Sequence, residues 1–481
     1  MKQKNTNHWI LLVLLALAQF MVVLDISIVN VMLPTVQHAF HMSQTSLQWV
    51  ITAYTLAFGG FLLLGGRAAD LFGRRRVFLT GAGLFAAISL ADGLSQSGGV
   101  LISLRALQGL CGAFMSPAAL SIVLVTYKEG HERNIALSVW GAVASGGAAV
   151  GVLLGGIITQ YLGWRWNFFI NVPIGFIVVI SGLKLLPTHE SEERHNDLDL
   201  PGAVLVTSAL MLLVYALTKA PTNGWLAKQS LIYFGLSAVL LVVFVLNELR
   251  AAHPLVPLSI FKSRNVVGAN LLQLSVAAGL FSVFFFTTLY VQEILGYSPI
   301  RTGFSFLPIP ISIAITAINA PKLIKRIGFK PILVVAPLFT GAGLFLLGHV
   351  PVTGGYFMHI LPGFIVMGLG LGLTFVSTLV AATSGVQKHL SGLASGLINT
   401  SQQVGGSLGL AVLSGIASSS TLRFLENTHN ISRDGVATAT LHGFHEGYFT
   451  AVSFSIFASL VAAFIIKQNR IQPSAVKSVN N

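Results

Sequence analysis

The chain contains 481 residues, of which 54% are hydrophobic and only 9% charged, and its mean hydropathy is +0.79. No soluble domain can bury so large an apolar fraction, so the composition indicates a protein that crosses a membrane many times. The net charge of +13 does not indicate nucleic-acid binding, because the basic residues lie on short connections between apolar runs. The single cysteine, Cys111, falls inside such a run and excludes a disulfide framework.

The first apolar run begins at Trp9, exceeds 20 residues and contains Asp25. It has no small-residue cleavage site, so we expect a retained first span and not a cleaved secretory signal. Further runs of about 20 residues predict 14 membrane-spanning helices. Their centres lie near Ala18, Leu56, Phe85, Leu110, Ala148, Val178, Leu210, Leu240, Ala277, Ile311, Val335, Gly368, Leu408 and Phe457.

The distribution of basic residues predicts the orientation of these helices. An even number of spans places both termini on one side of the membrane. When the connections are assigned alternately, 21 Lys and Arg residues fall on the side of the termini, six fall on the other side, and Arg105 lies within the membrane. By the positive-inside rule we expect both termini in the cytoplasm, in a multi-pass protein of the inner, cytoplasmic membrane.

A charged loop, Gly66-Arg-Ala-Ala-Asp70-Leu-Phe-Gly73-Arg74-Arg75-Arg76, follows the second run. Its arginines hold the loop on the cytoplasmic side, since basic residues beside a span resist translocation. Its glycines allow a tight turn and a close approach of helices, and Asp70 can pair with the cations.

The sequence also repeats itself weakly. The ladder Gly147, Gly151, Gly155 recurs 258 residues later as Gly405 and Gly409, and the turn at Gly73 recurs 255 residues later at Gly328. These landmarks predict two copies of a six-helix unit with two helices inserted between them, which is a transporter architecture. The expected parts are an N-terminal six-helix bundle (1–187), a cytoplasmic linker from His189 to Asp199 with two inserted spans (188–252), and a C-terminal six-helix bundle with a short cytoplasmic tail (253–481).

Two charged residues lie inside the predicted membrane region. Asp25 lies about 24 Å from the cytoplasmic end of its helix, and Arg105 lies about six residues inside the fourth span from the opposite face. Their similar depth makes a pair geometrically possible. Intramembrane charges are functional by default, so we favour Asp25 as a proton carrier over a static pair that only fixes packing. Arg105 either tunes Asp25 or holds a backbone carbonyl and a water.

Other candidate residues are less distinctive. Asp92 and Glu293 are expected at the outer ends of their helices as solvated rim residues, with Glu293 the stronger candidate for a substrate contact. A few polar groups in an apolar cavity suit lipophilic ligands of varied shape, although phenylalanines also face lipid or fill cores. The candidate cavity residues besides Glu293 are Phe281 and Phe285 of the ninth span and Asn399, Gln402 and Gln403 of the thirteenth.

The patterns of histidines and glycines argue against a metal site and against an ATP-binding site. No histidine pairs with acids or a thiol at metal-ligand spacing, so no metal site is predicted. No stretch resembles a phosphate-binding loop, so ATP is not expected as the energy source.

Several motifs, taken together, resemble the 14-helix drug:proton antiporter family of the major facilitator superfamily. The charged loop at Gly66 and the stretch Leu104–Gly109 are similar to motifs of the whole superfamily. The other stretches that resemble the 14-helix group are Leu24–Pro34, Trp164–Gly175, Gly296–Pro299 and Gly392–Thr400. The fifth-helix antiporter signature normally carries Gly-Pro, whereas this chain has Gly151-Val152, so we expect a straighter fifth helix.

The resemblance implies an all-α fold of two six-helix bundles plus two inserted helices, and no enzyme activity. It implies a monomer that exports lipophilic or cationic small molecules by alternating access, coupled to protons, with the proton gradient as energy source and no cofactor. Asp25 and Arg105 would couple the proton. Gly66, Asp70, Gly73, Arg74 and Arg75 would form a conformational latch, and the ladder from Gly147 to Gly155 would pack helices closely.

Three alternatives remain at this stage. The chain could export one specific metabolite or antibiotic, act as a facilitative uniporter, or serve as a transporter-like sensor. A proton-pumping subunit of a respiratory complex is disfavoured, because such subunits need lysines at mid-membrane and none is found there.

Overall fold

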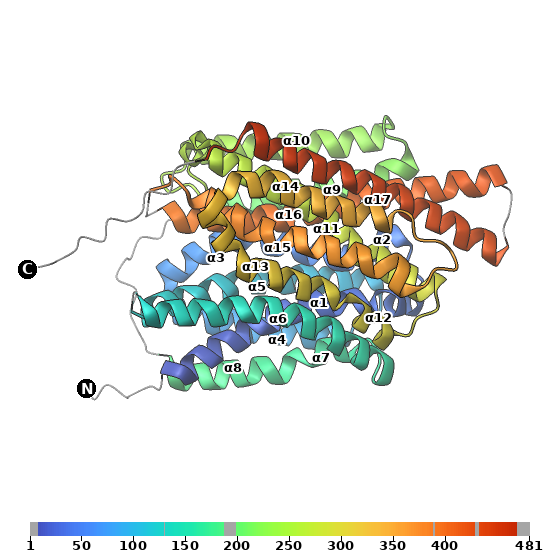
Figure 1. Cartoon of the computed structure of the whole chain (residues 1–481). Coiled ribbons are helices and arrows are strands. Elements are labelled where there is room, and N and C mark those ends of the chain that lie inside the picture. The colour runs from blue at the N-terminus through green and yellow to red at the C-terminus, as the bar shows by residue number, and fades with distance from the viewer. Residues whose placement is uncertain (1–7, 129, 187–198, 388–389, 429–431, 469–481) are drawn as a thin grey trace, which may run out of the picture.

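The computed structural model describes residues 8–128, 130–186, 199–387, 390–428 and 432–468. In this part of the chain, fourteen helical segments are long and apolar enough to cross a membrane, which confirms the predicted number. The helices lie roughly parallel in one bundle (Figure 1). We call the end of the bundle where α1 begins and α17 ends the terminal face, and the other end the distal face.

The first half of the molecule contains six spans. Its helices are α1 (His8–Phe40), α2 (Gln44–Leu47), α3 (Trp49–Phe72), α4 (Arg74–Gly93), α5 (Gly98–Thr126), α6 (His131–Tyr161), α7 (Trp166–Phe169) and α8 (Asn171–Leu185). Serine side chains cap two helix starts: Ser43 Oγ accepts from the Ser46 N–H, and Ser97 Oγ accepts from the Val100 N–H. Helix α6 continues without a break past Val152, where the antiporter signature has proline.

Two inserted helices follow, α9 (Leu200–Asn223) and α10 (Lys228–Arg250). Helix α9 packs against α3 and α16, and α10 packs against α9 at the edge of the bundle (Figure 1). Asp199 joins the two helices, because it caps α9 through the Gly202 N–H and accepts two hydrogen bonds from Asn247 of α10. Most of the predicted linker, residues 187–198, lies outside the described residues.

The second half again contains six spans. Its elements are η1 (Leu258–Lys262), α11 (Arg264–Leu289), η2 (Tyr290–Ile294), α12 (Pro299–Phe306), α13 (Pro308–Ile327), α14 (Phe329–Leu347), η3 (Tyr356–Ile360), α15 (Leu361–Thr383), α16 (Ser391–Thr428) and α17 (Arg433–Phe464). Span nine is α11 with η2, span ten is α12 with α13, and span twelve is η3 with α15.

The repeated landmarks occupy equivalent places in the two halves. Gly73 (φ 92°) and Gly328 (φ 83°) both form left-handed turns between the second and third spans of their halves. Helix α6 approaches α1 so closely that a Cβ at Gly151 would lie 2.6 Å from the Ser27 Cβ, and a Cβ at Gly405 of α16 would lie 2.2 Å from the Leu274 carbonyl oxygen of α11. The fifth span therefore packs on the first span in both halves.

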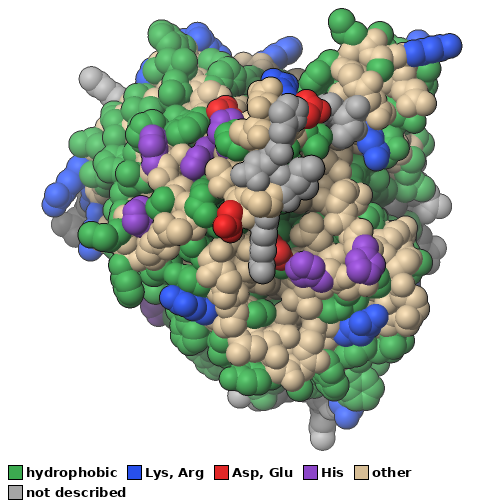
Figure 2. Space-filling view, turned by 90° about the vertical axis from the view of Figure 1, so that its right-hand side faces the viewer, with side chains coloured by type: hydrophobic (Ala, Val, Ile, Leu, Met, Phe, Trp, Pro, Cys, Tyr) green, Lys and Arg blue, Asp and Glu red, His purple; other side chains and the backbone are tan. Residues whose placement is uncertain are grey.

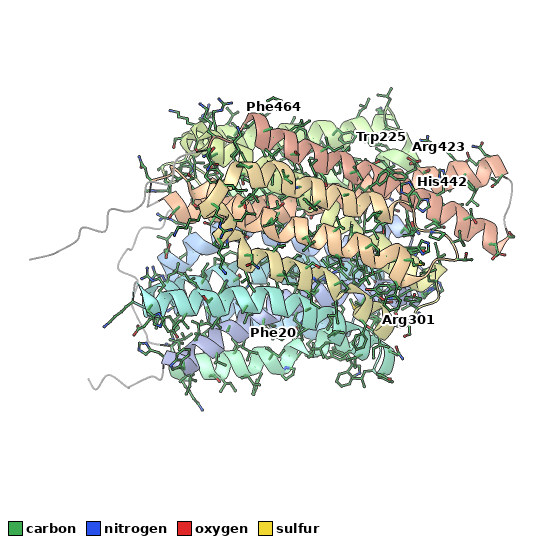
Figure 3. All side chains as sticks on the ribbon, viewed as in Figure 1. Phe20, Trp225, Arg301, Arg423, His442 and Phe464 are labelled. Atoms are coloured by element: carbon green, nitrogen blue, oxygen red, sulfur yellow. The ribbon has the colours of Figure 1, made fainter. Side chains whose placement is uncertain are left out.

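Large apolar side chains point outward from the bundle, as in a lipid-facing surface. Phe176 is 65% exposed, Ile318 74% and Phe464 75%, and Figure 3 shows Phe464 at the edge of the bundle. A bilayer replaces water around these side chains, so their exposure carries no hydrophobic penalty.

The two halves meet along two seams. In the first seam α3 lies against α16: Ser414 Oγ donates to Gln48 Oε1 (2.5 Å), and Thr400 Oγ1 donates to the Gly59 carbonyl (3.2 Å). Thr55 of α3, which lies between Gln48 and Gly59 in the sequence, shares a hydrogen bond with Ser407 of α16. This seam extends from the distal face past the middle of the bundle.

The second seam brings α1 and α6 against η2 and α12, toward the distal face. Gln292 Nε2 donates to the Val31 carbonyl (2.9 Å), and the Ile300 N–H donates to Gln160 Oε1 (3.2 Å). A Cβ at Gly303 would lie 2.4 Å from the Val152 carbonyl oxygen. Both seams therefore hold the halves together at the distal face.

Figure 2 looks onto the distal face, where histidines and acidic side chains gather among polar and apolar residues. The terminal face carries the Arg74–Arg76 cluster at the start of α4 and the Lys325–Arg326 pair at the end of α13. This distribution follows the predicted charge bias.

Candidate functional site

The structure brings Asp25 and Arg105 together inside the first half. Arg105 Nη1 donates to Asp25 Oδ2 at 2.6 Å, and the two side chains are 1% and 0% exposed, respectively. Asp25 lies near the middle of α1, and Arg105 lies seven residues into α5. The similar depth expected from the sequence is therefore realised as a direct, charge-assisted contact.

Arg105 also meets the second expectation, a bond to a backbone carbonyl. Its Nε donates to the Val50 carbonyl of α3 at 3.1 Å, and Nη1 makes a further short contact with Gln108 Oε1. The guanidinium lies 4.4 Å from the centre of the Tyr54 ring, which adds a cation–π contact. The contact with Asp25 and the contact with the backbone carbonyl thus use different nitrogens of one side chain.

The other oxygen of Asp25 is held by two amides. Gln108 Nε2 and Asn171 Nδ2 each donate to Asp25 Oδ1 at 3.0 Å. A second bond from Asn171 reaches Ser89 Oγ at 3.0 Å, and Ser89 in turn donates to the Phe168 carbonyl at 2.9 Å. Five spans of the first half, from α1, α3, α4, α5 and α8, therefore contribute to one buried network.

Sequence reasoning missed the roles of Gln108, Asn171 and Ser89. The first two stand inside motifs that were recognised, three residues after Arg105 and within Trp164–Gly175. Amides inside a predicted span were the available signal, since neutral polar groups in a membrane need an interior partner. Ser89 carried no such signal, because serines commonly bond their own helix.

A glycine in the fourth-span motif allows this arrangement. A Cβ at Gly109 would lie 2.2 Å from the Tyr54 carbonyl oxygen, so only glycine lets α5 approach α3 this closely. The contact brings Arg105, one turn earlier on α5, within reach of the Val50 carbonyl on α3.

The prediction for Asp92 was wrong. A solvated rim residue was expected because Asp92 is the second-last residue of α4, but its side chain is 0% exposed. Helix α4 packs against α5, α7 and α8, and at this end Gly93, the next residue, lies against the ring of Phe169 in α7. Within the described part of the chain, neither carboxyl oxygen of Asp92 has a hydrogen-bond partner.

The residues of the expected latch lie at the terminal face. Arg74 Nη2 pairs with Asp70 Oδ1 at 3.1 Å, with both side chains partly exposed, and Arg75 Nη2 donates to the Leu183 carbonyl of α8 at 2.7 Å. Gly73 makes the turn.

The close helix approach expected at Gly66 occurs one residue earlier. A Cβ at Gly65 would lie 2.1 Å from the Ala113 carbonyl oxygen, whereas a Cβ at Gly66 would make only an ordinary contact of 3.8 Å with Pro117. The two adjacent glycines point in different directions from α3, and only Gly65 points toward α5.

The candidate cavity residues lie in different surroundings. Phe285 is a core residue of α11, 0% exposed, and its ring lies edge-on to that of Phe286. Phe281 packs over Gly406 of α16, whose Cβ would lie 2.4 Å from its ring. Both side chains therefore pack into one core cluster, which also contains Ile28 and Val29 of the first half.

The three candidate amides of α16 also differ in their surroundings. Asn399 is exposed, and Gln402 is half-buried. Gln403 lies at the seam with α3, since a Cβ at Gly59 would contact its Cβ at 2.8 Å. Of these three amides, Gln403 has a demonstrated contact with the other half.

Glu293 lies at the distal rim, as expected for a solvated residue. Its Oε1 is 2.9 Å from His38 Nε2 of α1, and the two side chains are 37% and 72% exposed. The pair bridges the two halves, so Glu293 belongs to the second seam.

The distal face also carries a pocket of about 510 Å³. It lies between the loop that joins the inserted helices and the distal ends of α16 and α17, where Figure 3 labels Trp225, Arg423 and His442. Phe424 and Glu446 complete its aromatic and charged lining. Among the described residues no group of His, Cys, Asp or Glu could hold a metal ion.

A buried acid–arginine pair inside one of two duplicated six-helix bundles defines a class of protein, the polytopic membrane transporters. The comparisons with known proteins specify the family. The family model for the major facilitator superfamily matches residues 15–410. This chain belongs to the major facilitator superfamily, and the proteins of this family are transporters rather than enzymes.

Curated relatives cover most of this chain. It is 41% identical to the puromycin resistance protein pur8 of Streptomyces alboniger over 96% of this chain and 91% of the relative. It is 36% identical to the tetracenomycin C resistance and export protein of Streptomyces glaucescens, over 84% and 75%. It is 32% identical to the multidrug resistance protein Stp of Mycobacterium tuberculosis, over 86% and 76%.

A solved structure shares the fold. The chain matches a bacterial homologue of the lysosomal transporter Spinster with a TM-score of 0.70 over 96% of this chain and 97% of that structure, at 13% sequence identity. At this identity the likeness establishes the fold alone.

Proposed function

We propose that this protein exports antibiotics or other lipophilic or cationic drugs across the cell membrane in exchange for protons, by alternating access. The single observation that carries proton coupling is the buried Asp25–Arg105 pair at 2.6 Å, held by Gln108 and Asn171. The names of the relatives, which describe resistance and export, support efflux of small molecules. The energy source would be the proton gradient, with no cofactor.

Protonation of Asp25 would change the forces between helices. A proton on this carboxyl group removes the negative charge that attracts Arg105, and a buried arginine without its acid is strongly disfavoured. The bundle can respond by moving α1 relative to α5. Such a local change biases an equilibrium between two states when the two states bind the proton differently.

The glycine ladder offers a route from Asp25 to the other half. A Cβ at Gly147 would meet Val23, and a Cβ at Gly155 would meet Ile28, so the ladder of α6 lies along the segment of α1 that carries Asp25. Between these two glycines on the same helix, Val152 contacts Gly303 of α12 in the second half. A shift of α1 can therefore reach the second seam through close, rigid packing.

The distal contacts support a state closed toward the distal face. With the termini in the cytoplasm, as the charge bias predicts, this state faces the cytoplasm and would load drug. Release outside requires both distal seams to open, and the latch at Asp70 and Arg74 would then engage at the terminal face.

The test uses everted membrane vesicles that contain the protein, with ethidium and puromycin as probes. We expect an acid-inside pH gradient to drive uptake of a probe and nigericin to abolish it. Asp25→Asn should lose gradient-driven uptake by about a hundredfold, because it removes the proton-binding group. The variant should still fold, with a lower melting temperature, because Arg105 loses its acid. Gradient-driven uptake by Asp25→Asn at the wild-type rate would remove Asp25 from the mechanism.

A second candidate is an exporter with a narrow substrate range. Two of the relatives are named for single antibiotics, puromycin and tetracenomycin C, which favours a specific antibiotic. The multidrug name of Stp favours the broader range. Growth of a sensitive bacterial host that expresses the protein, measured on puromycin, ethidium and structurally unrelated antibiotics, separates the two. Protection against one chemical class supports the specific exporter.

A further inference from the structure

Asp92 is a buried acid that the Asp25–Arg105 pair leaves unexplained. Its side chain is 0% exposed, and neither carboxyl oxygen has a hydrogen-bond partner in the part of the chain that the structure describes. It lies within electrostatic range of both Arg105 and Asp25. A carboxylate buried without donors is strongly disfavoured, so this position calls for a stabilising charge or a proton.

Polar groups lead from Asp25 toward Asp92. Asn171 donates to both Asp25 Oδ1 and Ser89 Oγ, each at 3.0 Å. Ser89 lies three residues before Asp92 on α4, which is one helical turn or about 4.5 Å along the axis. One amide and one hydroxyl therefore lead from Asp25 to the turn of α4 that precedes Asp92.

Polar groups also lie between Asp92 and the distal surface. The Ser95 N–H donates to the Asp92 carbonyl, and the Ser95 hydroxyl is buried without a partner in the described residues. Arg165, beside α7, donates to the Ser95 carbonyl at 3.2 Å. The next residue, Gln96, is exposed. Asp92 thus lies one short step beneath the distal surface.

The charges in this region do not balance. With both carboxyl groups ionised, Asp25, Asp92 and Arg105 carry two negative charges and one positive charge, all at 0–1% exposure. Arg105 contacts Asp25 directly, so Asp92 is the group left without a partner. One proton shared between the two acids restores neutrality.

From this geometry we propose that Asp92 is a second proton-binding site, through which protons pass between the distal surface and Asp25. This proposal rests on the proposed proton coupling and adds a route and a second acid. The proton first binds the Asp92 carboxylate. It then moves past Ser89 and Asn171, carried by exchangeable water, and binds Asp25 when Asp25 separates from Arg105. Asp92 acts on the proton alone and contacts no substrate.

The test compares two transport modes of the purified protein in liposomes. Gradient-driven uptake of ethidium or puromycin requires proton binding and release, whereas exchange of labelled for unlabelled probe across the membrane (counterflow) requires only movement of the loaded carrier. We expect Asp92→Asn to slow gradient-driven uptake by about tenfold or more and to leave counterflow within about twofold of wild type. Asp92→Glu should retain most of the uptake.

A small acid provides the readout that a structural role would not change. In Asp92→Ala, formate can enter the space that the side chain leaves and carry protons there. Formate at about 10–100 mM, enough to saturate a weak binding site, should therefore restore uptake at least severalfold. Leu94→Asn is the matched control, because it introduces an amide at an exposed position two residues away. Its uptake should match wild type with and without formate.

The outcomes separate this inference from the proposed function. Wild-type uptake by Asp92→Asn, or loss of both uptake and counterflow without formate rescue, overturns the proton site at Asp92 and leaves coupling at Asp25 intact. Absence of gradient-driven uptake in the wild-type protein overturns proton coupling itself, and the Asp92 route with it. Selective loss of uptake together with formate rescue supports the route.

Discussion

At the scale of single residues, one arginine organises the candidate site. Arg105 uses separate nitrogens for Asp25 and for the Val50 carbonyl and also lies over the Tyr54 ring. A planar guanidinium can make all of these contacts at once, because its donors point in fixed, divergent directions. The identity of the cation should therefore matter as much as its charge.

Arg105→Lys tests this requirement. A lysine keeps the positive charge but cannot reach Asp25, Gln108 and the Val50 carbonyl together, so we expect gradient-driven uptake to fall by about tenfold or more. The measurement is probe uptake in everted vesicles at matched protein levels. Arg264→Lys, at the exposed start of α11, is the control and should transport at the wild-type rate. Full activity of Arg105→Lys would mean that charge alone suffices.

At the scale of elements, glycines determine which helices approach each other. The fifth span packs on the first in each half through Gly151 and Gly405, and α5 approaches α3 through Gly65 and Gly109. Without water, the hydrophobic effect does not drive helices together inside a bilayer, so close van der Waals packing carries this task. These contacts fix the positions from which Arg105 and Asp25 meet.

Gly109→Ala tests the tightest of these contacts beside the site. The added methyl group would lie 2.2 Å from the Tyr54 carbonyl oxygen, so α3 and α5 must separate. We expect a loss of about 1–3 kcal/mol in stability, measured as a lower melting temperature of the purified protein, together with reduced uptake. Gly141→Ala in α6, where a Cβ meets nothing within 4 Å, should not lower the melting temperature. An unchanged melting temperature for Gly109→Ala would contradict the tight contact.

At the scale of the whole molecule, the two halves are joined at the distal face. The His38–Glu293 bridge connects α1 to η2, and the contact of α6 with α12 lies beside it. Alternating access requires this connection to break once in each cycle. A covalent link across it should therefore stop transport without damage to either half.

The cross-link is made with His38→Cys and Glu293→Cys in a Cys111→Ala background. The two native side chains approach to 2.9 Å, so a short thiol-reactive linker can span the pair. We expect cross-linking to abolish uptake, and a reducible linker to restore uptake when it is cleaved. Each single cysteine variant, treated in the same way, should keep its activity. Undiminished transport by the fully cross-linked protein would show that the second seam stays closed throughout the cycle.

Much of this architecture could be predicted from the sequence by itself. The length of apolar runs determined the 14 spans, because a bilayer core demands about 20 apolar residues per helix. The repeated turns at Gly73 and Gly328 determined the duplication, since positive φ angles restrict both positions to glycine. The depth of Asp25 and Arg105 along their helices determined that they could meet.

Only the tertiary structure decided which faces of the helices point inward. In a membrane both lipid and protein core are apolar, so hydrophobic periodicity does not distinguish the buried Phe285 from an exposed phenylalanine. Neighbouring helices bury Asp92 although it lies at a helix end. They also place Gly65 instead of Gly66 at the close contact and bring Asn171 to Asp25. Contacts between distant segments decide burial and partners, and no local pattern encodes them.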